Sequence, residues 1–216
     1  TLKKTNRSTV KRVPKRGHYD SKTVHAVLDQ NHICHVGIVH QGAPVVIPTL
    51  YGRSGDQLFV HGASVSRLMT ELEGEIELSI SVAKTKGLVL ARSAFHHSLN
   101  YESVVLFGKG SLISNTDEKL HALKSVSDHL IPGRWEEVRQ PSAKELKATK
   151  VIAIPLEEAT AKIRTGGPVD DKADYELDIW AGELPVVEKY GSPIADEKLA
   201  PEFRKLPKSI VQLINP

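Results

Sequence analysis

The sequence predicts a mainly β protein with peripheral helices, the α+β class, in which about six antiparallel strands close into a barrel. Two observations predict the strands. Short apolar runs recur about every ten residues from 33 to 61 between glycine-containing turns, and residues 75–83 alternate apolar with polar side chains. A third observation predicts the helices, because apolar side chains at helical spacing occur before, between and after these runs.

The first elements in order are a helix and a meander. The segment "DSKTVHAVLDQ" offers Asp20 or Ser21 as an N-cap, and Val24, Val27 and Leu28 form its apolar face. Three strands follow as "ICHVGIVH", "PVVIPTLY" and "QLFVH", joined by the turns "QGA" and "GRSGD". A short helix is then predicted at "SRLMTEL", and it ends at Gly74.

Three further strands are predicted at "EIELSISVA", "GLVLARSAF" and "SVVLFGKGSLI". In the second half, Asn115 and Glu118 have the spacing of a capping box, and the helix that they begin ends before Pro132. Ser142 and Glu145 repeat this spacing ahead of the strand "KVIAIPL". The segment "EEATAKIR" is expected to form a last short helix.

Charge and proline content divide the chain into three parts: a basic arm (1–17), a barrel domain (18–183) and a proline-rich arm (184–216). The net charge of +3 is an average, because the first arm carries seven basic and no acidic side chains. Such an arm could bind nucleic acid, although a solvated tail or a segment packed on a partner subunit is the simpler interpretation.

The single cysteine, Cys34, excludes an intrachain disulfide and a cysteine-based zinc cluster, which fits a reducing compartment. It lies in an apolar strand, so we expect a buried hydrophobic side chain. Residues 30–52 carry no charge, but histidines and prolines interrupt them, and no membrane span or membrane partner is predicted. No signal peptide is apparent, and we expect a cytoplasmic protein.

Several common catalytic motifs are absent from the sequence. It contains no G-x-x-x-x-G-K-[ST] loop, no G-x-S-x-G elbow and no H-E-x-x-H pair. The stretch "GKGSLI" lacks the third glycine of a dinucleotide fingerprint. His96 and His97 are adjacent and would point apart in an extended chain, so no metal site is predicted.

Two segments have unusual compositions. In "LFVHGASVSRLM", a strand passes through small and hydroxyl residues to Arg67 and then becomes helical, which is the pattern of a phosphate-binding turn. The segment "ARSAFHHSLNYESVVLFG" is rich in amide, hydroxyl and aromatic groups, and it could form a loop that covers a planar ligand. Together they suggest a flavin mononucleotide (FMN) site.

These two segments, extended to "VVIPTLYGRSGDQLFVHGASVSRLM" and "LARSAFHHSLNYESVVLFG", resemble the pyridoxamine 5'-phosphate oxidase-related FMN-binding proteins, and most closely the nitroimidazole-resistance branch. The resemblance covers about residues 12–185 and implies an FMN-binding split β-barrel with antiparallel, Greek-key-like topology. It also implies a homodimer with FMN at the subunit interface.

The resemblance implies roles for ten residues. Ile47, Pro48 and Thr49 would face the flavin ring, and His61 would lie beside it. Ser64, Ser66 and Arg67 would hold the phosphate. Asn100, Tyr101 and Ser103 would reach the site from the same or the other subunit. The authentic oxidases carry a basic residue where Thr49 stands and an arginine-bearing C-terminal segment, whereas this chain ends in "KSIVQLINP".

We therefore expect an FMN-binding oxidoreductase that acts on a small planar substrate and is not an authentic pyridoxamine phosphate oxidase. His61 is the candidate catalytic residue, as an acid, a base or an electrostatic neighbour of the flavin, unless it serves only in packing. One alternative is a flavin carrier or sensor without catalysis. Another is a haem-binding or haem-degrading protein on the same barrel, with a histidine as axial ligand.

Overall fold

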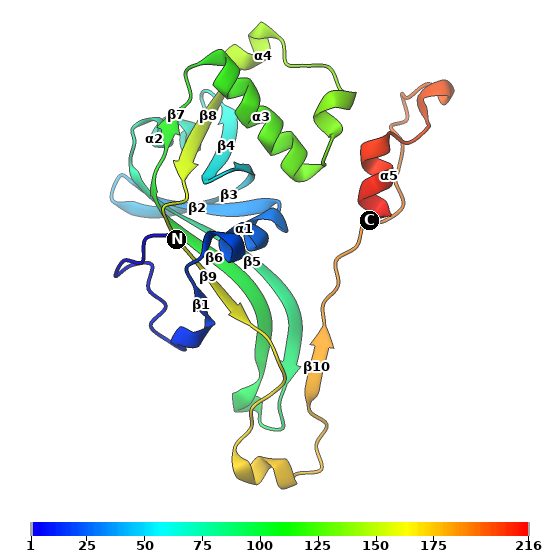
Figure 1. Ribbon diagram of the computed structural model, residues 1–216. Coiled ribbons are helices and arrows are strands. Elements are labelled where there is room, and N and C mark those ends of the chain that lie inside the picture. Colours follow the sequence, from blue (N-terminus) through cyan, green and yellow to red (C-terminus); the bar gives the residue numbers. More distant parts are fainter. Residues whose placement is uncertain (1, 216) are drawn as a thin grey trace.

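The computed structural model describes residues 2–215 as one antiparallel sheet system with helices at its edges (Figure 1). The strands pair in the order β1-β9-β6-β5-β2-β3-β4-β8-β7, and β10 pairs with β5. The strands are β1 (Gly17–His18), β2 (Ile33–His40), β3 (Ala43–Ser54), β4 (Gln57–Ala63), β5 (Glu77–Leu90), β6 (Ser98–Lys109), β7 (Ser111–Leu112), β8 (Thr149–Pro155), β9 (Glu158–Arg164) and β10 (Gly182–Pro185). The predicted class, mainly β with peripheral helices, is confirmed.

The helices begin close to the predicted caps. They are α1 (Ser21–Asp29), α2 (Arg67–Glu73), α3 (Thr116–Leu130), α4 (Ala143–Ala148) and α5 (Lys208–Ile214), with short 3-10 turns η1 (Pro14–Arg16), η2 (Ala94–His96), η3 (Arg134–Glu137), η4 (Lys172–Glu176) and η5 (Pro201–Phe203). The Asp20 carboxylate accepts the Thr23 N–H at 2.8 Å, and Asn115 caps α3. Ser142 and Glu145 form both halves of the predicted capping box of α4.

The predicted meander is present as β2, β3 and β4. Gln41 and Gly42 connect β2 to β3, and both have positive φ (50° and 79°), as a two-residue hairpin of type I′ requires. Gly55, with φ 55°, serves in the next turn. Val36, Leu58, Val60 and other buried side chains of these strands contribute to the main core inside the barrel.

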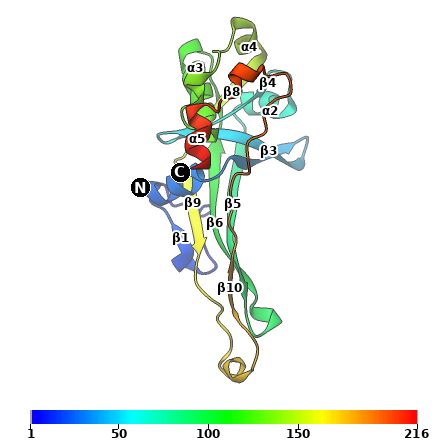
Figure 2. The ribbon, with the colours of Figure 1, turned by 90° about the vertical axis from the view of Figure 1, so that its right-hand side faces the viewer.

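Two predictions about the later strands were wrong. The segments "EIELSISVA" and "GLVLARSAF" belong largely to one strand, β5, which continues far beyond its three-residue pairing with β2. Together with β6, β9 and β10 it forms a long arm directed away from the barrel, with η4 at its tip (Figures 1 and 2). Seven register pairs with β6 keep residues 158–164 extended, and Ala159 and Ala161 are fully buried in the core. Tertiary pairing thus overrides the helical propensity of "EEATAKIR".

Helix α3 packs on the opposite face of β3 and β4 from the barrel core. Phe59, Ala122, Val126 and Val151 form a second apolar cluster there. The helix approaches β3 so closely at Gly52 that a β-carbon on this residue would lie 2.5 Å from the Val126 backbone. Gly52 therefore allows α3 to lie directly on the sheet.

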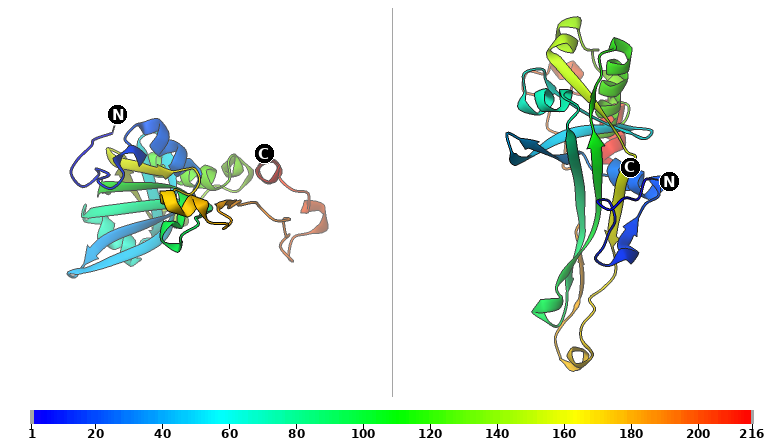
Figure 3. Two further views of the ribbon diagram at one scale, coloured as in Figure 1. Left: turned by 90° about the horizontal axis from the view of Figure 1, so that it is seen from below. Right: turned by 90° about the vertical axis from the view of Figure 1, so that its left-hand side faces the viewer.

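The two terminal arms differ in how they contact the rest of the chain. The basic arm is fastened to the barrel, because Arg7 pairs with Glu77 at 2.8 Å and with Glu158 at 2.7 Å. After β10, residues 186–206 cross to α5 in an extended course with many exposed side chains, and Figure 3 shows this segment looping away from the body. No helix within residues 2–215 is long and apolar enough to cross a membrane.

Candidate functional site

The candidate site lies where β3 and β4 separate. Tyr51 and Val60 are the last Cα partners of these two strands. Beyond them, Pro48, Thr49 and Leu50 of β3 pair only with β2, and His61, Gly62 and Ala63 of β4 pair only with β8. The two strands therefore diverge into a fork, which presents the predicted residues of β3 on one side and those of β4 on the other.

The fork opens into a cavity of about 440 Å³ beneath α3 and the segment that leads to α4. Leu50 and His61 line it from the two sides of the fork, so the cavity and the fork form one site. The rest of the wall comes from Leu123, Val126, Ser127, Leu130, Trp135, Arg139, Pro141, Glu145, Leu146 and Thr149. The wall is largely apolar, and its volume is in the range typical of cofactor sites, roughly 300 to 1,000 Å³.

His61 is the notable polar group of this cavity. It follows Phe59 on the face of β4 that is turned toward α3, because successive side chains of a strand alternate between faces. Its Nδ1 is buried and has no hydrogen-bond partner among the described residues. Burial lowers the pKa of His61 below its usual value of 6.5, so the imidazole is neutral at neutral pH. His61 thus lines the cavity as a neutral imidazole whose Nδ1 makes no hydrogen bond within the described residues.

Arg139 and Glu145 close the polar end of the cavity. The guanidinium donates from both terminal nitrogens to the two carboxylate oxygens, each at 2.8 Å. Glu145 also accepts the Ser142 N–H, and these bonds together hold its pKa well below the usual value. The pair therefore holds the loop before α4 against α4 itself and maintains the cavity wall.

The residues predicted to hold the phosphate come directly after β4 in the sequence. Ser66 caps α2 by accepting the Met69 N–H at 3.4 Å, and Arg67 is exposed without an ion-pair partner in the described part of the chain. Gly62 has a packing role, because a β-carbon there would lie 3.1 Å from Met69 Cγ and 3.4 Å from Ser66 Oγ. The small residues of this turn thus have structural reasons of their own, whereas Arg67 has a free guanidinium.

On β3, the residues predicted to face a flavin ring divide between the two faces. Ile47 is partly buried against the main core. Pro48 is exposed, and the Thr49 hydroxyl donates to the Leu50 carbonyl at 3.4 Å. These three residues lie on the β3 side of the fork, and His61 lies on the β4 side, with Ser64, Ser66 and Arg67 following in the chain. Their roles in binding a flavin stay predictions.

Asn100, Tyr101 and Ser103 lie elsewhere. The expected loop is limited to residues 91–97, and these three residues belong to β6. Asn100 and Tyr101 pair with Gly87 and Thr85 of β5, beyond the part of β5 that pairs with β2. Asn100 is buried between Glu183, to which it donates at 2.7 Å, and Arg164, from which it accepts. It ties β6, β9 and β10 together, so within one chain it does not reach the fork. A contribution from a second subunit remains a prediction.

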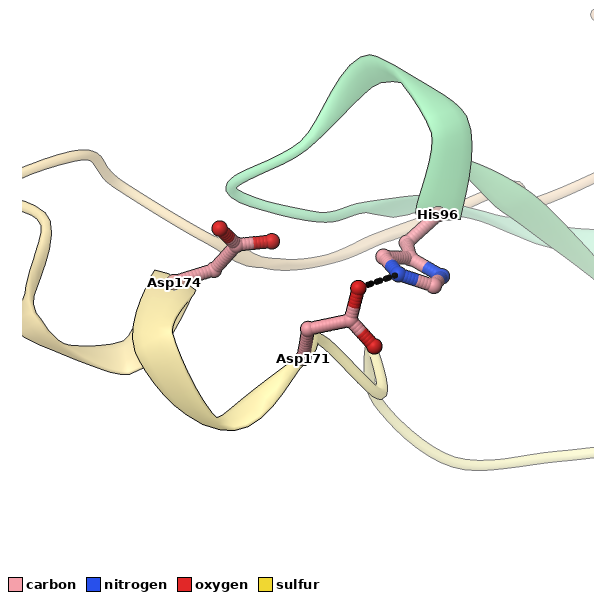
Figure 4. A group of neighbouring side chains, drawn as sticks. All are labelled: His96, Asp171 and Asp174. Atoms are coloured by element: carbon pink, nitrogen blue, oxygen red, sulfur yellow. Dashed lines mark ion pairs between the residues drawn. The ribbon is translucent and has the colours of Figure 1, made fainter.

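One cluster of possible metal ligands lies at the tip of the arm. His96 of η2 faces Asp171 and Asp174 at the start of η4, and ligand atoms of all three lie within 4.8 Å of one another (Figure 4). His96 Nε2 is 3.4 Å from Asp171, whose side chain is 83% exposed. This ion pair joins two loops of the arm and is separate from the fork.

Sequence reasoning missed most of the cavity wall. In the sequence, nothing distinguishes several residues of this wall from ordinary apolar positions of helices or loops: Leu123, Leu130, Trp135 and Leu146. The apolar side chains of α3 that pack toward Phe59 have helical spacing, and this pattern does not distinguish a cavity from a core.

The sequence and the fold are similar to those of known proteins. A family model described as pyridoxamine 5'-phosphate oxidase matches residues 20–163. A search of curated proteins finds no significant match.

Among solved structures, the flavocytochrome Anf3 from Azotobacter vinelandii is 39% identical, with a TM-score of 0.91 and 97% of each chain covered. The FAD and haem binding protein from Mycobacterium smegmatis is 32% identical, with a TM-score of 0.88, and the match covers 92% of this chain and 97% of that one. A protein described as a 5-nitroimidazole antibiotic resistance protein, from Bacteroides thetaiotaomicron, is 24% identical, with a TM-score of 0.58 over 68% of this chain and 86% of that one, and supports the fold alone.

Proposed function

Because this chain belongs to the pyridoxamine 5'-phosphate oxidase family and has its split-barrel fold, we propose that it is a redox protein that binds both a flavin and a haem. Two relatives match more than 90% of this chain. One is described as a flavocytochrome and the other as a FAD and haem binding protein. These relatives support the haem-binding alternative better than the flavin-only oxidoreductase expected from the sequence. One of them is described with FAD, so the flavin here is proposed as a flavin phosphate, with FMN and FAD both open.

The observation that carries the haem half of the proposal is the environment of His61. A haem macrocycle is flat and largely apolar, and histidine is a common axial ligand. The cavity supplies an apolar wall around one histidine whose buried Nδ1 lacks a partner. The pKa of His61 is lowered by burial, which keeps the ring in the neutral form that binds metals. The residues present therefore fit this group.

The flavin half rests on Arg67 and the fork. Arg67 and the hydroxyls of Ser64 and Ser66 lie directly after the divergence of β3 and β4. A guanidinium without an acidic partner is suited to a phosphate group, with which it forms charge-assisted hydrogen bonds. Ile47, Pro48 and Thr49 lie on the opposite strand of the fork, where a ring system extending from this phosphate would be placed.

When bound, a flavin exchanges one or two electrons and a haem exchanges one. The chain's own part is positional and electrostatic. His61 offers a lone pair and remains unprotonated. Leu123, Leu130 and Trp135 supply apolar wall to the cavity, and Arg67 would balance the charge of the phosphate. This role for His61 replaces the general acid or base expected from the sequence.

We also propose that the protein is a homodimer. Val39 and Val46 are 65% and 64% exposed on neighbouring strands, and Val187 and Ile194 of the C-terminal segment are 80% and 96% exposed. Apolar exposure of this extent is typical of an interaction surface, and two-fold dimers are the commonest assemblies. Light scattering at micromolar concentration would refute this part by finding a monomer that retains its flavin.

Absorption spectroscopy of the purified protein tests the function. We expect flavin bands and a Soret band together. His61→Ala should remove the Soret band and leave the flavin bands, whereas His97→Ala, which changes an exposed histidine between η2 and β6, should alter neither. If the His61→Ala protein retains the Soret band, a residue other than His61 binds the haem iron. A wild-type protein without a Soret band would refute haem binding.

Arg67 is tested by comparing two flavins. Arg67→Ala should weaken flavin mononucleotide by roughly ten- to hundredfold, because a charge-assisted hydrogen bond contributes about 1.5 to 3 kcal/mol. Riboflavin, which lacks the phosphate, should lose almost nothing, and Arg67→Lys should recover part of the affinity. Equal losses for both ligands in calorimetry would place the phosphate elsewhere.

A further inference from the structure

A second cavity lies under the basic N-terminal arm, on the other side of the sheet system from α3. Its volume is about 230 Å³. The arm forms one wall with Arg7, Ser8, Thr9, Val10, Lys11 and Arg12, and strands β6 and β9 form the other with Ser103, Val105, Phe107, Thr160 and Lys162. The function proposed above does not use this cavity.

The arm that forms its wall is held in place by specific bonds. The Thr160 hydroxyl, which is buried, donates to the Ser8 carbonyl at 2.7 Å, and the Val10 N–H donates to the Tyr19 hydroxyl at 2.9 Å. Arg7 donates to both carboxylate oxygens of Glu158 and lies over the Phe107 ring at 5.1 Å. The cavity is therefore built into the fold, and it is not a gap beside a solvated tail.

The charge of this cavity is unbalanced. Arg7 is neutralised by its two glutamates, but the side chains of Lys11, Arg12 and Lys162 have no ion-pair partner within residues 2–215. No acidic side chain occurs among the residues that line the cavity. Three like charges around a small recess repel one another, and the recess therefore concentrates positive potential that an anion would relieve.

We propose that this cavity binds the phosphate or diphosphate group of a small organic phosphate. Arginine and lysine side chains bind phosphate, and Lys11, Arg12 and Lys162 all line this cavity, whereas the Ser103 hydroxyl donates to the Lys162 carbonyl at 3.2 Å. The volume is below the roughly 300 to 1,000 Å³ of sites that enclose a whole ligand, so the phosphate end enters and the remainder of the ligand lies outside. The site is distinct from Arg67, which lies beyond β4 at the start of α2.

Calorimetric titration of the full chain, purified with its bound cofactors, tests the proposal, with inorganic pyrophosphate and ADP as probes. Wild-type protein should bind both at low ionic strength, and more weakly as salt is added. Arg12→Gln and Lys162→Gln should each weaken binding by about tenfold or more, and Arg12→Lys should retain most of it. Lys15→Gln removes one charge from the same arm outside the cavity and should leave binding unchanged.

The source of the phosphate is distinguished by the flavin content of the same preparations. Binding of ADP to protein with full flavin occupancy indicates a separate nucleotide. Loss of flavin from Arg12→Gln or Lys162→Gln would count against a separate site, because the flavin phosphate is assigned to Arg67, and both variants should therefore keep full flavin occupancy. If neither probe binds, or if Lys15→Gln has the same effect as Arg12→Gln, the proposal is refuted, while the spectrum of the wild-type protein still decides the function proposed above.

Discussion

Gly52→Ala is the substitution whose effect the structure defines most closely. Gly52 is buried on β3 and does not have a positive φ, so alanine is compatible with its backbone conformation. At such a position, Gly→Ala stabilises a protein by about 0.4 to 1 kcal/mol through the entropy of the unfolded chain. The contact with α3 predicts the opposite sign.

The magnitude follows from the distances. The new β-carbon would lie 2.5 Å from Val126 Cα and 2.5 Å from Val126 N, whereas ordinary contacts are 3.4–4 Å. Backbone atoms cannot rotate away, so α3 must move outward by about 1 Å and lose its fit to Phe59. Overpacking of this kind costs about 1 to 3 kcal/mol, and we expect the upper end, about 2 kcal/mol after the entropic gain. For a chain of this size the melting temperature should fall by about 4 to 8 °C.

Urea unfolding followed by circular dichroism measures this difference. Gly191→Ala is the matched control, because no atom lies within 4 Å of its new β-carbon, and we expect a change within about 0.5 kcal/mol. Since α3 also supplies Leu123 and Leu130 to the cavity, Gly52→Ala should lower haem occupancy as well. A Gly52→Ala protein as stable as the Gly191→Ala control would show that α3 does not rest on β3 as described.

Two further predictions concern buried titratable groups. Burial raises the pKa of the Cys34 thiol to about 12, so a thiol reagent should modify it only after unfolding, and Cys34→Ser should leave flavin content unchanged; rapid modification of the native protein would contradict this. Burial lowers the pKa of both His61 and His129 from 6.5, so the unfolded chain binds more protons than the native chain just below that pH. Stability should therefore decrease as the pH falls below about 6.5, before the carboxylates titrate, and urea unfolding that is flat between pH 7 and pH 5 would refute the assignment.

Some features were predictable because their causes are local. The predicted caps at Asp20, Asn115 and Ser142 depend on residues within three positions, and the structure shows all three. The burial of Cys34 follows from the apolar alternation of its own strand. The resemblance implied the split-barrel fold, which is confirmed, and it also implied roles for the residues at the fork, which stay predictions.

The features that sequence reasoning missed depend on distant partners. Residues 157–164 have helical propensity, but residues 158–164 pair with β6, which lies far away in the sequence, and this pairing makes the segment a strand. From the sequence, Asn100 was expected in a loop that covers a ligand. In the structure it lies in β6 and bonds to Arg164 and Glu183 of two other strands. Similarly, Leu50, His61 and Trp135 are far apart in the chain and line one cavity only because β3 and β4 diverge beneath α3. Local propensities act within a few residues, whereas burial and strand pairing join positions more than a hundred residues apart, such as Gly17 and Lys162. The elements can therefore be predicted from the sequence, but the cavities are defined only by the tertiary structure.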